Sequence, residues 1–364
     1  MKVLHFIYDD LKNPWVAGGG AVRTFEIYRA LGDRVDATVV TGSYPGARDE
    51  VVEGVRFQRI GATGPYAWSR LTYGVAASRL MRRAEYDVAV SDFSVYTPLV
   101  VPRDRPVGFV LHHVTGPSAG RRWGRLVGRA VAGLERWLLG RARIIGVPSR
   151  WAMEQVGPLA PEARLDLVGG GVGDAFFQVR REEGDYVLFF GRLDVFQKGL
   201  DTLIRAYAAL REAGRIEPLY IAGRGKDARA VDALAREAGV SEYVRLLGAV
   251  DDRRRLELLA GARVLLMPSR FEGFGLVAAE AMAAGVPLVA SDAGALPEVV
   301  DAPRGGILVP VDDADALAAA AESLLREDAR RAALSASARD SARRFRWDAV
   351  AERHLAFLED AARL

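Results

Sequence analysis

A strand, a glycine-containing loop and a helix can be read in the segment VLLMPSRFEGFGLVAAEAMAA, residues 264–284. The strand is predicted over Val264–Met267, where four apolar residues precede the turn Pro268–Arg270. The helix is predicted to begin near Leu276, after the two glycines of the loop. Strand, loop and helix in this order form the unit from which parallel α/β sheets are built. The segment therefore predicts an α/β fold.

The same alternation runs along the whole chain. In the first half we predict strands over Val3–Ile7, Ala37–Val40, Val55–Ile60, Val88–Val90, Val107–Leu111 and Ile144–Val147. In the second half we predict strands over Tyr186–Phe190, Leu219–Ala222, Val244–Leu247, Val264–Met267, Leu288–Ala290 and Ile307–Val309. Between the two sets lies the glycine-dense stretch Val168–Asp174, which is suited to a hinge. We expect two doubly wound domains, over residues 1–170 and 171–346, that face each other across a cleft.

Composition excludes several classes of protein. The chain has 364 residues, a net charge of +3 and no cysteine, so neither a disulfide framework nor a cysteine-ligated zinc site can form. No apolar run is long enough to span a bilayer, and the N-terminal apolar run is too short for a signal peptide. We expect a cytoplasmic protein.

Positive charge is concentrated between Pro117 and Arg150, where Glu135 is the single acid among eight arginines. The arginines of this segment are Arg121, Arg122, Arg125, Arg129, Arg136, Arg141, Arg143 and Arg150. Apolar residues lie between them at helical spacing. One interpretation is a surface helix whose apolar stripe belongs to the core. The other is a cationic face over Arg121–Arg143 for an anionic acceptor or for the inner face of an anionic membrane. We expect no nucleic-acid partner, because no nucleic-acid motif accompanies the charge.

Two cations follow the predicted strand Tyr186–Phe190. Arg192 comes just after the strand, and Lys198 follows within the same loop. Such a pair could neutralise a leaving diphosphate, although it is also typical of a solvated surface.

Two glutamates bracket the start of the predicted helix at Leu276. Glu272 lies in the loop, and Glu280 lies within a helix of otherwise small, apolar residues. Gly275 permits close approach of the backbone, and free amides at the helix start can bind an anion. The alternative is that Glu272 only caps the helix and that Glu280 is an ordinary exposed residue.

Two features of the first half complete the candidate set. Gly18–Gly20 follow the first predicted strand, and His112 follows the strand Val107–Leu111. A glycine run before a helix can cradle phosphate, but it lacks the dinucleotide-binding spacing. A histidine at a strand end can equally be structural.

Together these motifs resemble family 4 of the GT-B glycosyltransferases, over essentially the whole chain. The resemblance rests on the Arg192/Lys198 loop, the Glu272…Glu280 spacing and the run Pro287–Val300. It implies a retaining, metal-independent hexosyltransferase of glycan biosynthesis, which uses a UDP- or GDP-sugar as co-substrate and needs no cofactor. It also implies that the C-terminal helix, residues 347–364, joins the first, acceptor-binding domain, and that the second domain binds the donor.

The resemblance assigns a role to each candidate. Arg192 and Lys198 would hold the donor diphosphate, and Glu280 would bind its ribose. Glu272 would contact the transferred sugar, aided by the backbone around Phe274, Gly275 and Leu276, and His112 would lie beside that sugar. Gly19 and Gly20 would approach the phosphates. The acceptor would be a lipid, a saccharide or a small-molecule hydroxyl.

The sequence departs from the family at two places and leaves other functions open. The usual Pro-Asn-Gly-Val-Asp of the domain junction is replaced by Gly169–Gly173, and Arg224 stands where an acid is common. A sugar-nucleotide 2-epimerase of the same fold is the main alternative. A dehydrogenase is disfavoured because no Gly-x-Gly-x-x-Gly follows Ile7, and a binding module is disfavoured by the presence of both glutamates and both cations.

Overall fold

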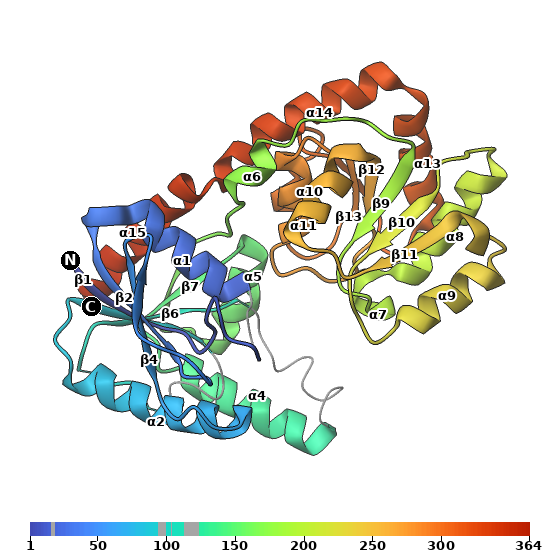
Figure 1. Ribbon diagram of the computed structural model, residues 1–364. Helices are drawn as coiled ribbons and strands as arrows, with labels where there is room; N and C mark the ends of the chain where they lie inside the picture. The colour runs from blue at the N-terminus through green and yellow to red at the C-terminus, as the bar shows by residue number, and fades with distance from the viewer. Residues whose placement is uncertain (16–18, 94–99, 103, 113–123) are drawn as a thin grey trace. The chain divides into compact units, whose positions relative to one another are not determined.

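The computed structural model describes residues 1–15, 19–93, 100–102, 104–112 and 124–364. The chain divides into two compact units. Unit 1 consists of Met1–Gly170 and Trp347–Leu364, and unit 2 consists of Gly171–Arg346. Each unit is a sheet covered by helices (Figure 1).

Unit 1 contains an eight-stranded sheet in the order β3-β4-β2-β1-β5-β6-β7-β8. Its strands are β1 (Lys2–Phe6), β2 (Asp36–Gly42), β3 (Glu50–Val52), β4 (Val55–Ile60), β5 (Val88–Asp92), β6 (Val107–Val110), β7 (Ile144–Val147) and β8 (Arg164–Leu167). All neighbours pair in parallel except β3, which pairs antiparallel with β4. The sequence did not predict β3 and β8, the two edge strands.

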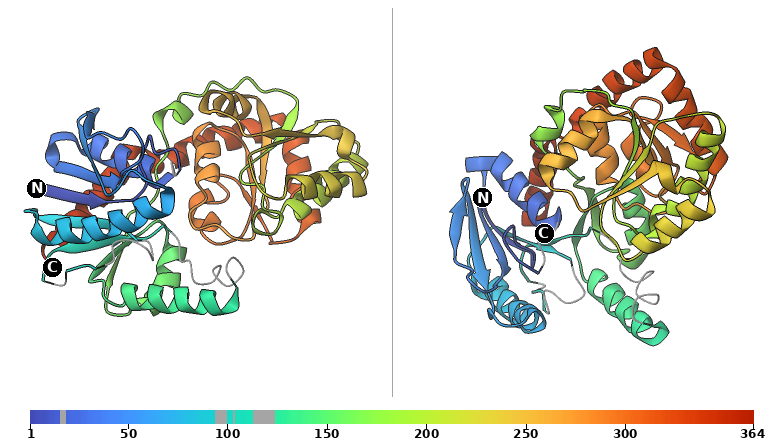
Figure 2. Two further views of the ribbon diagram at one scale, coloured as in Figure 1. Left: turned by 60° about the horizontal axis from the view of Figure 1, so that its bottom comes forward. Right: turned by 45° about the vertical axis from the view of Figure 1, so that its right-hand side comes forward.

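Helices cover both faces of the sheet in unit 1 (Figures 1 and 2). Helices α1 (Gly19–Leu31) and α15 (Trp347–Ala362) pack together on one face. Helices α2 (Tyr66–Arg83), α4 (Arg125–Leu139) and α5 (Arg150–Val156) lie on the other. Because side chains alternate along a strand, Val3 and His5 of β1 face α1 and α15, while Leu4 and Phe6 face α2. Both faces are buried, as expected for a parallel sheet.

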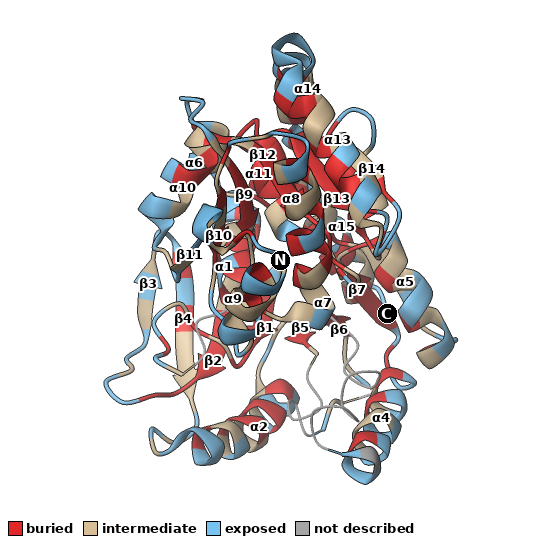
Figure 3. Ribbon diagram, turned by 90° about the vertical axis from the view of Figure 1, so that its right-hand side faces the viewer, coloured by how far each residue is buried: buried red, intermediate tan, exposed pale blue. Residues whose placement is uncertain are grey.

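Unit 2 contains a six-stranded parallel sheet in the order β11-β10-β9-β12-β13-β14. Its strands are β9 (Tyr186–Phe190), β10 (Leu219–Ala222), β11 (Val244–Gly248), β12 (Ala262–Met267), β13 (Leu288–Ser291) and β14 (Ile307–Val309). Helices α8 (Leu200–Glu212), α9 (Ala228–Glu237) and α13 (Ala314–Arg326) cover one face. Helices α10 (Asp252–Gly261), α11 (Leu276–Ala283) and α14 (Asp328–Ala342) cover the other. Strands β12 and β13 are almost wholly buried (Figure 3).

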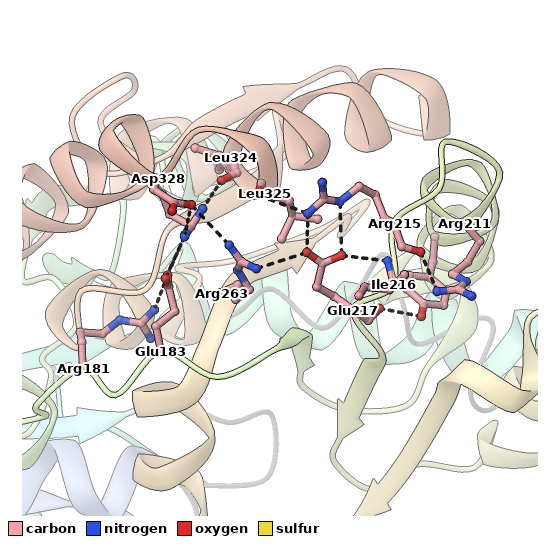
Figure 4. Close-up of polar contacts among 12 residues, drawn as sticks. Arg181, Glu183, Arg211, Arg215, Ile216, Glu217, Arg263, Leu324, Leu325 and Asp328 are labelled. Carbon is pink, nitrogen blue, oxygen red and sulfur yellow. Dashed lines mark hydrogen bonds and ion pairs between the residues drawn. The ribbon is translucent and has the colours of Figure 1, made fainter.

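Ion pairs link segments near the amino ends of the strands in unit 2 (Figure 4). Arg263, near the start of β12, contacts Glu217, which precedes β10, at 3.4 Å and Asp328 at 3.5 Å. Arg331 binds Glu183, which precedes β9, through two hydrogen bonds of 2.7 and 2.8 Å. This edge of the sheet is therefore stabilised by charge pairs, while the candidate residues lie beyond the opposite, carboxyl ends of the strands.

Candidate functional site

Lys198 and Glu272 lie together beyond the carboxyl ends of β9 and β12. Lys198 is the last residue of the short helix α7 (Val195–Lys198), and its Nζ forms an ion pair with Oε1 of Glu272. Ser269 donates a hydrogen bond of 3.0 Å to the same carboxylate oxygen. Both partners are largely buried. The loop that carries Lys198 and the loop that carries Glu272, both predicted from the sequence, thus meet in unit 2.

Glycine at position 294 permits the loop that carries Glu272 to pack closely. Gly294 has a φ of +56°, and a Cβ at this position would overlap the backbone of Glu272. The amide of Ala295 donates a hydrogen bond of 2.9 Å to the Glu272 carbonyl. The same loop is held from its other side by Arg270, which donates two hydrogen bonds to Asp201, of 2.9 and 2.7 Å. The position of Glu272 is therefore set by contacts from α8 and from the loop after β13.

The helix that follows Glu272 begins without a side-chain cap in the described structure. Gly275 is the N-cap of α11, with a φ of +90°, and no described side chain caps this end. The first amides of a helix have no intrahelical partner and can bind an anion, and that this terminus, which begins at Leu276, binds one stays a prediction. Phe274 packs edge-to-face against Phe345 at 5.6 Å and so anchors the loop before this terminus.

Glu280 is buried in the interior of α11, so its interpretation as an ordinary exposed residue is wrong. Only 4% of its surface is accessible, and its Oε2 pairs with Arg255 of α10. Burial raises the pKa of Glu280 to about 7, although the Arg255 guanidinium acts in the opposite direction. The guanidinium also lies over the ring of Phe190, 4.8 Å from its centroid. The sequence analysis missed Arg255, because nothing distinguishes it from the two arginines before it.

Arg192 has surroundings that differ from those of Lys198. It is exposed in the loop after β9, and no carboxylate within the described parts of the chain pairs with it. The loop itself is well fixed, since Leu193 donates a hydrogen bond of 2.8 Å to the carbonyl of Arg224. A Cβ at Gly223 would overlap the carbonyl oxygen of Gly191, so this close packing requires glycine. The Arg192 guanidinium is thus exposed and has no carboxylate partner among the described residues, while the backbone that carries it is held in place.

In unit 1, His112 lies close to Gly20 and to an acid that the sequence analysis missed. Asp92, at the end of β5, bonds His112 through Nε2 at 2.8 Å and His5 through Nε2 at 2.9 Å. A Cβ built on Gly20 would lie 3.6 Å from Asp92 Oδ2 and 3.6 Å from His112 Nε2. Gly19 and Gly20 form the first two residues of α1, while Gly18 lies outside the described residues.

The apolar stripe of α4 is not part of the core, which corrects the first interpretation of this segment. Leu126 is 80% exposed, and Val127, Leu134 and Trp137 are about half exposed, whereas Leu139 is buried. The Arg141 guanidinium lies 3.7 Å from the ring centroid of Trp137. Arg121 and Arg122 lie outside the described residues. Arg129 and Arg136 of α4 are exposed as well, so exposed apolar and cationic side chains share this helix. No helix in the described ranges is long and apolar enough to cross a membrane.

Comparisons with known proteins agree with these features. Residues 184–327 match the family described as "Glycosyl transferases group 1", and residues 17–175 match "Glycosyltransferase Family 4". A phosphatidyl-myo-inositol mannosyltransferase of Mycolicibacterium smegmatis is 36% identical over 216 residues, which are 58% of this chain and 55% of that protein. A D-inositol 3-phosphate glycosyltransferase of Xylanimonas cellulosilytica is 42% identical over 166 residues, 45% of this chain and 40% of that protein. The chain thus matches about half the length of these relatives.

Solved structures share the fold over the whole chain. A sucrose-phosphate synthase from Thermosynechococcus elongatus superposes with a TM-score of 0.77 at 20% identity, and covers 99% of this chain and 98% of its own. Anabaena HepE in complex with UDP-glucose gives a TM-score of 0.70 at 19% identity, with 100% of each chain covered. At these identities the likeness concerns the fold alone.

Proposed function

We propose that this chain, which belongs to glycosyltransferase family 4 and has the GT-B fold, is a retaining hexosyltransferase. The donor is a UDP- or GDP-sugar, and no cofactor or metal takes part. The acceptor is a hydroxyl group of a lipid, a saccharide or a small molecule. The names of the relatives, which specify inositol compounds, favour an inositol hydroxyl among these acceptors.

The observation that carries the proposal is the buried Lys198–Glu272 pair in front of the α11 N-terminus. In the free protein Lys198 neutralises Glu272. When a diphosphate enters, Lys198, Arg192 and the α11 amides can stabilise its charge, which grows as the bond to the sugar breaks. Glu272 then accepts hydrogen bonds from the sugar hydroxyls. Oε1 of Glu280 accepts hydrogen bonds from the ribose, while Arg255 occupies Oε2.

Transfer itself requires no nucleophile from the protein. The bond between the anomeric carbon and the diphosphate oxygen breaks, and both electrons leave with the diphosphate. The acceptor oxygen forms the new bond from the same face, and a phosphate oxygen takes the hydroxyl proton. The protein contributes position and charge, and His112 is the group of unit 1 that we propose to contact substrate.

A thermal-shift panel of UDP- and GDP-sugars tests this proposal. A donor that binds only the folded protein adds about 2.7 kcal/mol of stability at a concentration of 100 times Kd, and so raises the Tm. The shift should largely vanish in Lys198→Met. It should persist in Lys12→Met, which removes an exposed ion pair in unit 1. A panel without any shift, or a shift that Lys198→Met leaves unchanged, would contradict the donor site.

We further propose that α4 lies on an anionic membrane surface. Its exposed Leu126, Val127 and Trp137 can enter the interface, while Arg129, Arg136 and Arg141 meet lipid phosphates. Binding to vesicles that contain phosphatidylinositol should exceed binding to pure phosphatidylcholine, and Leu126→Ser should weaken it. Ile216→Ser in unit 2 is the matched control, because Ile216 is also 80% exposed. Equal effects of both substitutions, or equal binding to both vesicles, would exclude this surface.

A further inference from the structure

A chain of hydrogen bonds connects the core of unit 1 to His112. The Tyr28 hydroxyl of α1 lies 2.8 Å from Nδ1 of His5, and Nε2 of His5 lies 2.9 Å from Oδ1 of Asp92. The second oxygen of Asp92 lies 2.8 Å from Nε2 of His112. Tyr28, His5 and Asp92 are buried, whereas one third of the His112 side chain is exposed. The chain of hydrogen bonds therefore begins in the core and ends at a side chain that is partly exposed to solvent.

The positions of the protons follow from the charge of Asp92. Burial alone would raise its pKa, but the bonds to His112 and His5 outweigh burial and hold the pKa of Asp92 far below its usual range. An ionised carboxylate only accepts hydrogen bonds, so Nε2 of each histidine must carry a hydrogen and donate it. Burial also raises the pKa of Tyr28, which keeps its hydroxyl proton as a donor for Nδ1 of His5. Nδ1 is then the remaining polar atom of the His112 ring.

His5 is a polar residue in an otherwise apolar part of the core. It lies on the face of β1 that otherwise carries apolar core residues such as Val3, and a buried polar ring is costly unless it is hydrogen-bonded. His354 of α15 provides a direct comparison. It is also fully buried and stacks on His5 with ring centroids 6.1 Å apart, but neither of its ring nitrogens has a hydrogen-bond partner in the described structure. Of these two buried rings, His5 is the one joined to Asp92.

We propose that His5 is a positioning residue: acting through Asp92, it holds His112 as the Nε2–H tautomer with Nδ1 available to the substrate. Gly20 lies beside the bonded pair of Asp92 and His112, because a Cβ at Gly20 would lie 3.6 Å from each of them. The start of α1 therefore adjoins the same pair of groups. The inference rests on the proposed function only in placing substrate at His112. The tautomer itself follows from contacts within unit 1.

Nitrogen-15 NMR of histidine-labelled protein tests the proposal directly, since the sequence has only four histidines. His112→Gln identifies the His112 signals, which in the wild type at pH 8 should be those of one Nε2–H tautomer. His5→Phe keeps a ring in place but removes both hydrogen bonds, and should turn His112 into a mixture of tautomers. His5→Gln, whose amide can still donate to Asp92, should restore the single form. His354→Phe, the matched control, should leave His112 unchanged.

Turnover provides a second measurement in the same variants. Release of the nucleoside diphosphate from the UDP- or GDP-sugar that gives the largest thermal shift should fall about tenfold in kcat for His5→Phe, with KM unchanged, and should recover in His5→Gln. Wild-type protein that releases neither UDP nor GDP from any sugar of the panel would count against the proposed donor, while the NMR result would still decide the role of His5. If His5→Phe does not fold, His5→Asn replaces it, because its shorter amide reaches Tyr28 but not Asp92. Unchanged His112 signals in these variants, or an equal change in His354→Phe, would overturn the proposal.

Discussion

Glu280 is the residue at which donor binding should depend most on pH. Burial raises its pKa to about 7, so the carboxyl gains its proton as the pH falls from 8 to 6. The neutral acid is a weaker acceptor for ribose hydroxyls, and we therefore expect the affinity for a nucleotide sugar to fall over this range. Glu280→Gln should lower the affinity by about 1.5–3 kcal/mol at pH 8 and remove most of the pH dependence.

Calorimetry measures both effects. The ligand should be a nucleotide sugar rather than a free nucleoside diphosphate. The terminal phosphate of a free diphosphate itself titrates at about pH 6, which would add a second pH dependence to the measured affinity. Glu237→Gln, at an exposed position of α9, is the control and should behave as the wild type. Equal pH dependence in wild type and Glu280→Gln would show that Glu280 does not contact the donor.

Lys198 and Arg192 should differ in their effect on stability, although we assign both to the diphosphate. Loss of one charge-stabilising group typically costs about 2.7–4 kcal/mol of transition-state stabilisation, so turnover should fall strongly in Lys198→Ala and in Arg192→Ala. Only Lys198→Ala leaves a buried carboxylate, that of Glu272, without its cation. Its Tm should fall, whereas Arg192 is exposed and its loss should leave the Tm unchanged. Turnover near that of the wild type in both variants would exclude the phosphate role.

The loop after β13 should control the position of Glu272. Alanine at Gly294 would adopt a left-handed conformation, at a cost of about 1–2 kcal/mol, and its Cβ would overlap the Glu272 backbone. Gly239→Ala imposes the same strain at a φ of +69°, but no atom lies near its Cβ. We expect Gly294→Ala to lower both Tm and donor affinity, and Gly239→Ala to lower Tm alone. Unaltered donor affinity in Gly294→Ala would show that this loop does not position Glu272.

The elements differ in how well the sequence predicts them, for physical reasons. Central strands such as β9 and β12 are buried on both faces and read as short apolar runs, so their positions were predicted within two residues. The edge strand β3 has only three residues, and the edge strand β8 alternates charged and apolar residues over four, so neither forms an apolar run and both were missed. The bond between His5 and Asp92 joins residues 87 positions apart, and the bond between Arg255 and Glu280 joins two helices. Such partners depend on tertiary packing, which local sequence pattern does not contain.

Both units place their candidate residues by the same rule. Asp92 ends β5, His112 follows β6, Arg192 follows β9 and Glu272 follows β12. In a parallel sheet all carboxyl ends lie along one edge, so correct strands suffice to bring the loops together. This is why a sequence that predicts the sheet also predicts much of the candidate site. In unit 2 the structure adds charge pairs along the opposite edge, which involve Glu183, Glu217 and Arg263.

Transfer should continue after exhaustive chelation of divalent cations. Asp313-Ala314-Asp315 is the sole Asp-x-Asp sequence, but Asp313 caps α13 by accepting a hydrogen bond of 2.8 Å from the Ala316 amide. Lys198, Arg192 and the α11 N-terminus already offer the diphosphate positive charge, so a magnesium ion has no unmet charge to balance. Asp315→Asn should likewise retain turnover. The measurement is the rate with a chelator and then with added magnesium, in wild type and Asp315→Asn. A rate abolished by the chelator and restored by magnesium would require a metal site and would contradict the proposed mechanism.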